Sequence, residues 1–105
     1  MSQFDIHRNR DKRSRSDTPL LLDMQPESMP SLATRLVVPV RRADAFQGMV
    51  LQRLHPEIRV KGEAYVAFVT EMAAVPRTIL GPVAESAQDH RAEIIAAIDL
   101  LITGF

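Results

Sequence analysis

Histidines, serines and glycines are the residues through which a short chain can hold a metal, cleave a bond or cradle a phosphate. The three histidines, His7, His55 and His90, are far apart, and none has a second histidine or cysteine at metal-site spacing. The four glycines are scattered, so no glycine-rich loop brings several amides to a phosphate. The serines fall in loop or cap contexts rather than on a glycine-flanked nucleophile turn: Ser14, Ser16, Ser28, Ser31 and Ser86. We therefore expect no catalytic residue, no metal and no cofactor.

A run of cations near the N-terminus is the clearest chemical feature, and we call residues 8–15 the basic loop. Its cations are Arg8, Arg10, Lys12, Arg13 and Arg15. Such a run can face solvent, dock an acidic protein or release counterions from a nucleic acid. Because no aromatic residue is interleaved to stack on bases, nucleic-acid binding is the least favoured of the three interpretations.

The composition describes one small soluble domain. The 105 residues are 46% hydrophobic, and 13 Lys and Arg balance 13 Asp and Glu. The net charge of zero differs from the strongly positive charge expected of a DNA coat protein. The absence of cysteine excludes disulfides and thiolate metal sites. No apolar run approaches the ~20 residues that cross a bilayer. We expect a single domain over residues 1–105 in the cytoplasm, away from membranes, with a core small enough for a homodimer to add stability.

Apolar alternation and turn residues predict short strands followed by one helix. The predicted strands are Gln3–Arg8, Leu20–Leu22, Thr34–Val40, Glu57–Val60, Ala64–Val69 and Arg77–Leu80. The basic loop then lies in a long hairpin loop, and Lys61-Gly62 forms a second, tight hairpin. Apolar residues at helical spacing from Ala87 to Ile102 predict a terminal helix, which Gly104 ends.

Proline, glycine and capping residues set several expected boundaries. Pro39 cannot donate to a ladder, so its strand is expected to end there or to lie at a sheet edge. Residues 72–76 are expected to form a turn, and Gly81-Pro82 to stop the last strand. Ser86 followed by Asp89 is typical of a capping box at a helix start.

The predicted elements favour a mainly β fold with α structure. Several strands precede one helix, without the alternation of a doubly wound sheet, so we expect a small antiparallel barrel or sheet with the helix packed on it. Residues 44–54 fit a helix or an interrupted strand equally well, and their structure stays undecided.

Five short blocks, spread over nearly the full chain, occur in an order and spacing that known proteins share. The blocks are Gln3-Phe4, Leu22-Asp23-Met24-Gln25, Arg35-Leu36-Val37-Val38-Pro39-Val40, Met72-Ala73-Ala74-Val75-Pro76 and Ile98-Asp99-Leu100-Leu101-Ile102-Thr103-Gly104-Phe105. In these blocks the chain resembles the CcdB-type toxins of bacterial toxin-antitoxin modules, which poison DNA gyrase.

The resemblance implies an SH3-like barrel, an antiparallel sheet plus a long C-terminal helix, assembled as a homodimer. It implies binding to the DNA gyrase A subunit and trapping of the cleaved gyrase–DNA complex, without catalysis by the toxin. The gyrase-facing positions correspond here to Ser28, Met29, Asp99, Ile102, Thr103, Gly104 and Phe105. Thr103 stands where the family usually has a tryptophan.

The resemblance also implies a CcdA-type antitoxin whose disordered, acidic segment folds on the toxin. Toxin and antitoxin together repress their operon, and any DNA contact of the toxin runs through gyrase or the antitoxin. The implied docking surfaces match the basic loop and residues 43–53, which include Phe46 and Met49.

Two alternatives stay open. A messenger-RNA interferase of the MazF/PemK kind shares the barrel and needs an arginine with a threonine, histidine or aspartate, for which Arg35, Thr34 and Thr78 supply the residue types. A chromosomal homologue without toxicity is the other alternative, motivated by Thr103.

Overall fold

The computed structural model describes residues 2–26, 32–45 and 52–104. Within them the chain forms seven strands, four short 3-10 turns and one α-helix. The strands are β1 (Asp5–Asn9), β2 (Leu20–Asp23), β3 (Thr34–Arg42), β4 (Glu57–Val60), β5 (Glu63–Ala67), β6 (Ala73–Pro76) and β7 (Leu80–Ser86). The 3-10 turns are η1 (Ala43–Ala45), η2 (Val69–Glu71), η3 (Arg77–Ile79) and η4 (Gln88–His90), and the helix is α1 (Arg91–Thr103).

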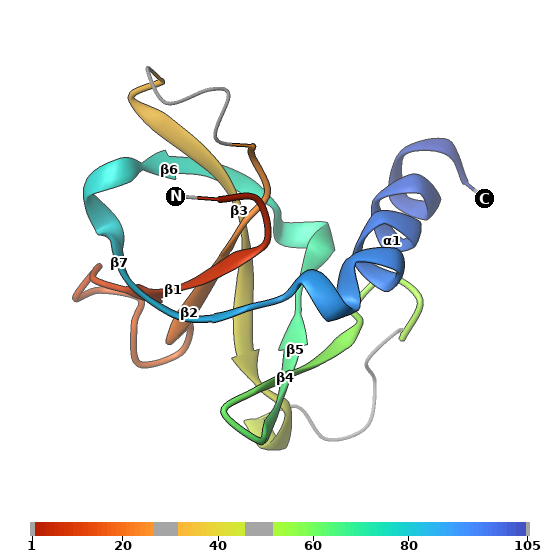
Figure 1. The fold of residues 1–105 in the computed structure, drawn as a ribbon, viewed down its shortest axis with the longest axis horizontal. Helices are drawn as coiled ribbons and strands as arrows, with labels where there is room; N and C mark the ends of the chain where they lie inside the picture. Colours follow the sequence, from red (N-terminus) through yellow and green to blue (C-terminus); the bar gives the residue numbers. More distant parts are fainter. Residues whose placement is uncertain (1, 27–31, 46–51, 105) are drawn as a thin grey trace.

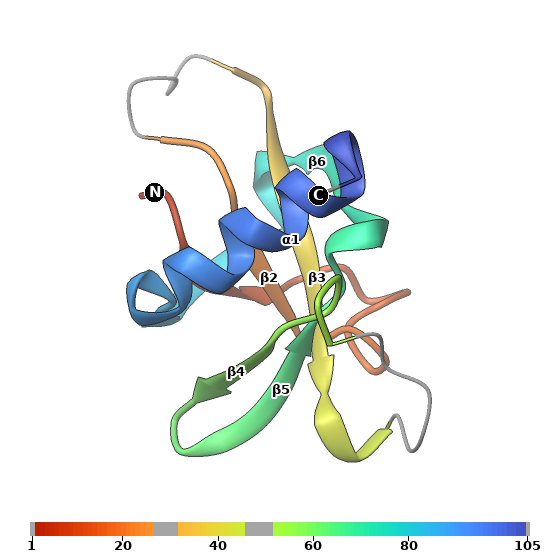
Figure 2. The ribbon, with the colours of Figure 1, turned by 90° about the vertical axis from the view of Figure 1, so that its right-hand side faces the viewer.

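The strands form one curled antiparallel sheet in the order β4-β5-β3-β2-β1-β7. β3 is nine residues long, so it can pair with two strands on one side: with β6 along residues 34–37 and with β5 along residues 40–42. The segment from β6 to β7 curls around one side of the molecule and α1 lies at the other (Figure 1). Figure 2 shows α1 crossing β2 and β3. The expected antiparallel sheet with a terminal helix is confirmed.

Side-chain alternation on the central strands divides the core in two. Leu20 and Leu22 of β2 point into the main core, where the buried residues of the sheet meet Ile94 and Ala97 of α1. Leu21 points the opposite way, into a smaller cluster with Val37 and Leu80. The β6–η3–β7 segment covers this second cluster, because Val75 of β6 and Ile79 of η3 pack against it.

The two expected hairpins are present. β1 pairs with β2 across the loop that contains the basic residues, with His7 opposite Leu21. β4 pairs with β5, and both turn residues between them have positive φ, 52° at Lys61 and 80° at Gly62. Two positive φ angles are the signature of the type I′ turn, whose twist matches that of the flanking strands.

The expectation that the third strand ends or becomes an edge at Pro39 is wrong. β3 runs through Pro39 to Arg42 in the middle of the sheet. The carbonyl of Pro39 accepts the N–H of Phe68 at 2.9 Å. The missing N–H of Pro39 faces the same side, at the point where β5 has ended and β6 has not begun, so no ladder bond is lost.

The expected turn at residues 72–76 is also wrong, because Ala73–Pro76 is the strand β6. Of the predicted strand at residues 77–80, Arg77–Ile79 form instead the turn η3, and Leu80 begins β7, which continues through Gly81-Pro82 to Ser86. β7 lies at the sheet edge, where a proline is tolerated. Its register with β1 shifts twice, between Ile6 and His7 and between His7 and Asn9, and each shift absorbs one extra residue of β7.

The helix starts later than the expected capping box. Ser86 Oγ accepts the N–H of Gln88 at 3.2 Å, and η4 precedes α1, which has no side-chain cap at His90. The N–H of Ala87 donates to the carbonyl of Phe4 at 2.7 Å, which ties the helix approach to β1. Gly104, with φ of 80°, ends α1 as predicted. Among the described residues no helix is long and apolar enough to cross a membrane.

Candidate functional site: two protein-binding surfaces

The C-terminal end of α1 projects from the core, and we call residues 99–104 the helix tip. Ile94 and Ala97, in the first turns of the helix, are fully buried. Leu101 is 42% exposed and Ile102 is 70% exposed. Burial therefore stops partway along the helix, and its last turn exposes apolar side chains.

Two hydrogen bonds close the helix tip. The N–H of Gly104 donates to the carbonyl of Leu100 at 3.0 Å, and the Thr103 hydroxyl donates to the carbonyl of Asp99 at 2.6 Å. The structure thus brings together Asp99, Ile102, Thr103 and Gly104, four of the seven predicted gyrase-facing residues. The other three, Ser28, Met29 and Phe105, lie outside the described residues.

The basic loop is held in one conformation by the Asn9 side chain. Its amide nitrogen donates to Ser14 Oγ and to the carbonyl of Thr18, both at 2.9 Å, and its amide oxygen accepts the N–H of Asp11 at 2.9 Å. The N–H of Arg15 donates to the carbonyl of Asp11 at 2.9 Å, as in a helical turn. The sequence predicted the loop but not this internal order.

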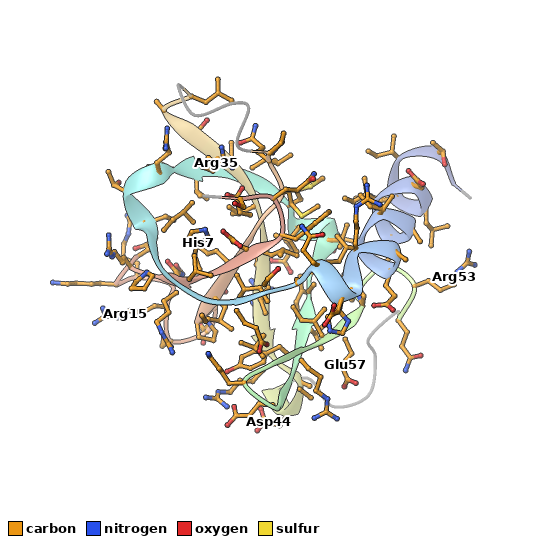
Figure 3. All side chains as sticks on the ribbon, viewed as in Figure 1. His7, Arg15, Arg35, Asp44, Arg53 and Glu57 are labelled. Carbon is orange, nitrogen blue, oxygen red and sulfur yellow. The ribbon has the colours of Figure 1, made fainter. Side chains whose placement is uncertain are left out.

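The five cations of the basic loop are all exposed: Arg8, Arg10, Lys12, Arg13 and Arg15. Only Arg13 has an acidic partner among the described residues, Asp11 at 3.6 Å. The Arg13 backbone N–H, and then its guanidinium charge, lower the pKa of Asp11 below its usual range. Arg15 lies at the opposite end of the molecule from α1 (Figure 3). The basic loop and the helix tip are therefore separate surfaces.

The second predicted antitoxin surface, residues 43–53, is described only in part. Residues 43–45 form the turn η1 directly after β3, and residues 52–55 form a further turn. Phe46 and Met49, the two residues predicted to contact an antitoxin there, lie outside the described residues.

Arg41 lies in a charged cluster that the sequence did not predict. Arg41 Nε donates to Thr18 Oγ1 at 3.0 Å, and its two terminal nitrogens donate to the two oxygens of Glu71 at 3.0 and 2.9 Å. The guanidinium carbon lies 4.7 Å from the centre of the Phe68 ring. The hydrogen-bonded partners of Arg41 are 23 and 30 residues away, so no local motif announces the cluster.

His55 extends the Arg41 cluster through Phe68. The two rings lie 4.9 Å apart, and His55 Nε2 is 2.7 Å from the Thr70 hydroxyl. The hydrogen bonds from Arg41 lower the pKa of Glu71, helped by the charges of Arg41 and His55 and opposed by partial burial. Glu71 is therefore held as a carboxylate on a fixed guanidinium.

The residues considered for RNA cleavage are not assembled for it. Arg35 is buried and donates to both carboxylate oxygens of Asp23, at 2.8 and 3.3 Å, and to the carbonyl of Gln25 at 2.6 Å. A phosphate cannot reach it, although Thr34 and Thr78 are exposed. Within residues 2–26, 32–45 and 52–104, no three metal-ligating side chains gather.

A comparison with known families found a match to the chain. The family model described as CcdB protein matches residues 3–104, nearly the whole chain. The match includes β1 to β7, the basic loop and the helix tip as far as Gly104.

Proposed function

Because this chain belongs to the CcdB family, and is thus a toxin of the toxin-antitoxin type, we propose that it binds the A subunit of DNA gyrase. On this proposal it traps the complex in which gyrase has cleaved DNA. The toxin forms and breaks no bond. It binds one conformational state of gyrase more tightly than the others, and that difference in affinity holds the state populated.

The observation that carries the proposal is the exposed, apolar helix tip. Ile102 and the adjacent Leu101 are 70% and 42% exposed at the end of a helix whose first turns are buried, and adjacent exposed apolar residues of this kind favour a protein contact. The αL cap at Gly104 stops the helix there, so the tip presents a compact end. Phe105, Ser28 and Met29 complete the proposed gyrase-binding set with Asp99, Ile102, Thr103 and Gly104.

A homodimer is part of the proposal, with its two helices side by side so that both tips face one gyrase dimer. Leu101, beside Ile102 on the helix tip, is 42% exposed. Its apolar area supports a contact between copies of the chain. Gyrase acts in the bacterial cytoplasm, so we place the toxin there.

The second proposed partner is a CcdA-type antitoxin. The four basic-loop cations without acidic partners among the described residues, Arg8, Arg10, Lys12 and Arg15, support docking of its acidic segment. Because the basic loop and the helix tip lie apart, the two partners use different surfaces. We further propose that the toxin–antitoxin complex represses its own operon through the DNA-binding domain of the antitoxin.

No described feature favours the interferase alternative, because Arg35 is enclosed by Asp23 and Gln25. The non-toxic alternative makes a different forecast, namely a folded protein that does not bind gyrase. A measurement of gyrase binding therefore separates the non-toxic alternative from the proposed function.

The test is binding to purified gyrase A subunit by calorimetry, with two matched variants. Ile102→Asp places a charge on the proposed contact and is expected to weaken binding roughly tenfold or more. Val83→Asp makes the same kind of change at a 50% exposed residue of β7, away from the tip. Equal affinity for the two variants would remove the helix tip from the gyrase contact, and no binding by the natural chain would support the non-toxic alternative.

A further inference from the structure

Two contacts other than Glu71 hold the Arg41 guanidinium in place. Thr18 Oγ1 holds Nε at 3.0 Å, and the Phe68 ring lies 4.7 Å beneath the guanidinium carbon. The side chain is 17% exposed. Two parallel N–H donors are left pointing outward, which is the geometry that binds a carboxylate bidentately.

A carboxylate of the same chain already occupies those two donors. Glu71 accepts both at 3.0 and 2.9 Å, yet its side chain is 50% exposed and belongs to the three-residue turn η2. Glu71 can therefore rotate into solvent without disturbing the core. The exchange of one carboxylate for another preserves both hydrogen bonds of Arg41, so it leaves no buried donor unpaired.

The position of Arg41 matches the proposed path of the antitoxin. Thr18 closes the loop that carries the basic residues, and Arg41 lies two residues before the 43–53 segment. Resting on the proposed function, we infer that Arg41 is a carboxylate-binding site for the acidic segment of the antitoxin, which Glu71 fills until a partner carboxylate displaces it. Glu71 is then a competitor within the chain that weakens antitoxin binding.

The test replaces Glu71 and compares it with the best-matched surface pair of the same protein. Glu71→Gln removes the competing charge from Arg41. Glu63→Gln removes the same charge from Arg42, whose side chain is 54% exposed and has no hydroxyl partner within the described part of the chain. The probe is a synthetic peptide of alternating glutamate and alanine, titrated by calorimetry at fixed low ionic strength.

The expected result is that Glu71→Gln binds the peptide roughly fivefold to tenfold more tightly than the natural chain, since one bidentate charge-assisted contact is gained. Glu63→Gln is expected to gain at most about twofold, from the general change in charge. Adding Arg41→Lys to Glu71→Gln is expected to remove the gain, because lysine has no planar fork.

Three results overturn the inference. Equal gains for Glu71→Gln and Glu63→Gln would leave only a charge effect, and a gain that survives Arg41→Lys would exclude Arg41. Tighter binding of a single-stranded oligonucleotide but not of the peptide would reassign the site to phosphate. Thermal unfolding of each variant checks that it is folded. Gyrase is absent from the measurement, so its outcome is independent of whether the chain poisons gyrase.

Discussion

Arg35 and Asp23 form a salt bridge that is closed off from solvent. Their charged atoms lie 2.8 Å apart, and the side chains are 1% and 0% exposed. Asp23 Oδ1 also accepts a hydrogen bond from the backbone N–H of Gln25, and the carbonyl of Gln25 accepts one from Arg35. The pair therefore fixes the chain as it leaves β2, and it places Arg35 beyond the reach of a substrate.

Removing one member of this pair is expected to be costly. Arg35→Met leaves the Asp23 carboxylate buried without its cation, so the free energy of unfolding should fall by about 3–5 kcal/mol. Arg35→Met combined with Asp23→Leu removes both charges and should recover most of that loss. Urea unfolding of the two variants measures the difference. A single variant as stable as the natural chain would mean that the pair is open to water in solution.

Gly81 is expected to tolerate no side chain, for a reason of space. A Cβ there would lie 2.8 Å from the carbonyl oxygen of Arg8 across the β1–β7 pairing. Gly81→Ala should lower the free energy of unfolding by roughly 1–3 kcal/mol, because the added methyl group is too close to the backbone of β1.

Gly62 offers a comparison in which only the backbone angle matters. It has φ of +80° and nothing within 4 Å of an added Cβ. Gly62→Ala should cost about 1 kcal/mol, and Gly62→Asn less, because asparagine tolerates the left-handed region. Amide exchange in β1 should rise for Gly81→Ala alone. The same rise for Gly62→Ala would contradict this separation of causes.

The Arg41–Glu71 pair makes stability depend on acid pH. Arg41 lowers the pKa of Glu71 in the folded protein below its usual 4.5, so the unfolded chain takes up the proton first as the pH falls. The stabilisation by Glu71 is therefore complete above pH 4.5 and is lost as the pH falls through the lower, folded pKa. The difference in unfolding free energy between the natural chain and Glu71→Gln should shrink below pH 4.5. A difference that stays constant across that range would show that the pair does not form.

The basic loop is expected to act by charge rather than by shape. Replacing Arg10 and Arg15 by serine removes two exposed cations and leaves the Asn9 contacts with Ser14 and Thr18 in place. Binding of the glutamate–alanine peptide should weaken several-fold, and its dependence on salt concentration should become shallower. Arg91→Ser removes an exposed cation at the start of α1 and is the control. An equal effect of Arg91→Ser would disperse the acidic contact over the whole surface.

Local signals were enough to predict part of the fold. Lys61 and Gly62 fix a turn type by their own backbone angles, and Gly104 stops the helix by the same means. Apolar alternation over Gln3–Arg8 predicted a half-buried strand, and Ile6 of β1 is 0% exposed, although the strand begins only at Asp5, after Phe4 with φ of 69°. Each of these features depends on residues that are neighbours in the sequence.

The features that the sequence did not predict depend on distant partners. Pro39 is accepted inside the sheet only because β5 and β6 divide the side of β3 that it faces. Gly81-Pro82 continues a strand because β7 has no outer neighbour among the described strands. Arg41 meets Glu71 across 30 residues of sequence. Such pairings are decided by the assembled sheet, and a pattern read along the chain does not contain them.

The central claim is that the helix tip holds gyrase on cleaved DNA. The most direct measurement incubates gyrase from the source organism with ATP, supercoiled plasmid and this protein, then adds detergent and protease to release trapped breaks. The full chain should yield linear plasmid. A variant that lacks Gly104 and Phe105 should yield none, once thermal unfolding has shown that the variant is folded. Linear plasmid with both proteins would contradict the role of the tip. Absence of linear plasmid with the full chain would contradict gyrase poisoning itself.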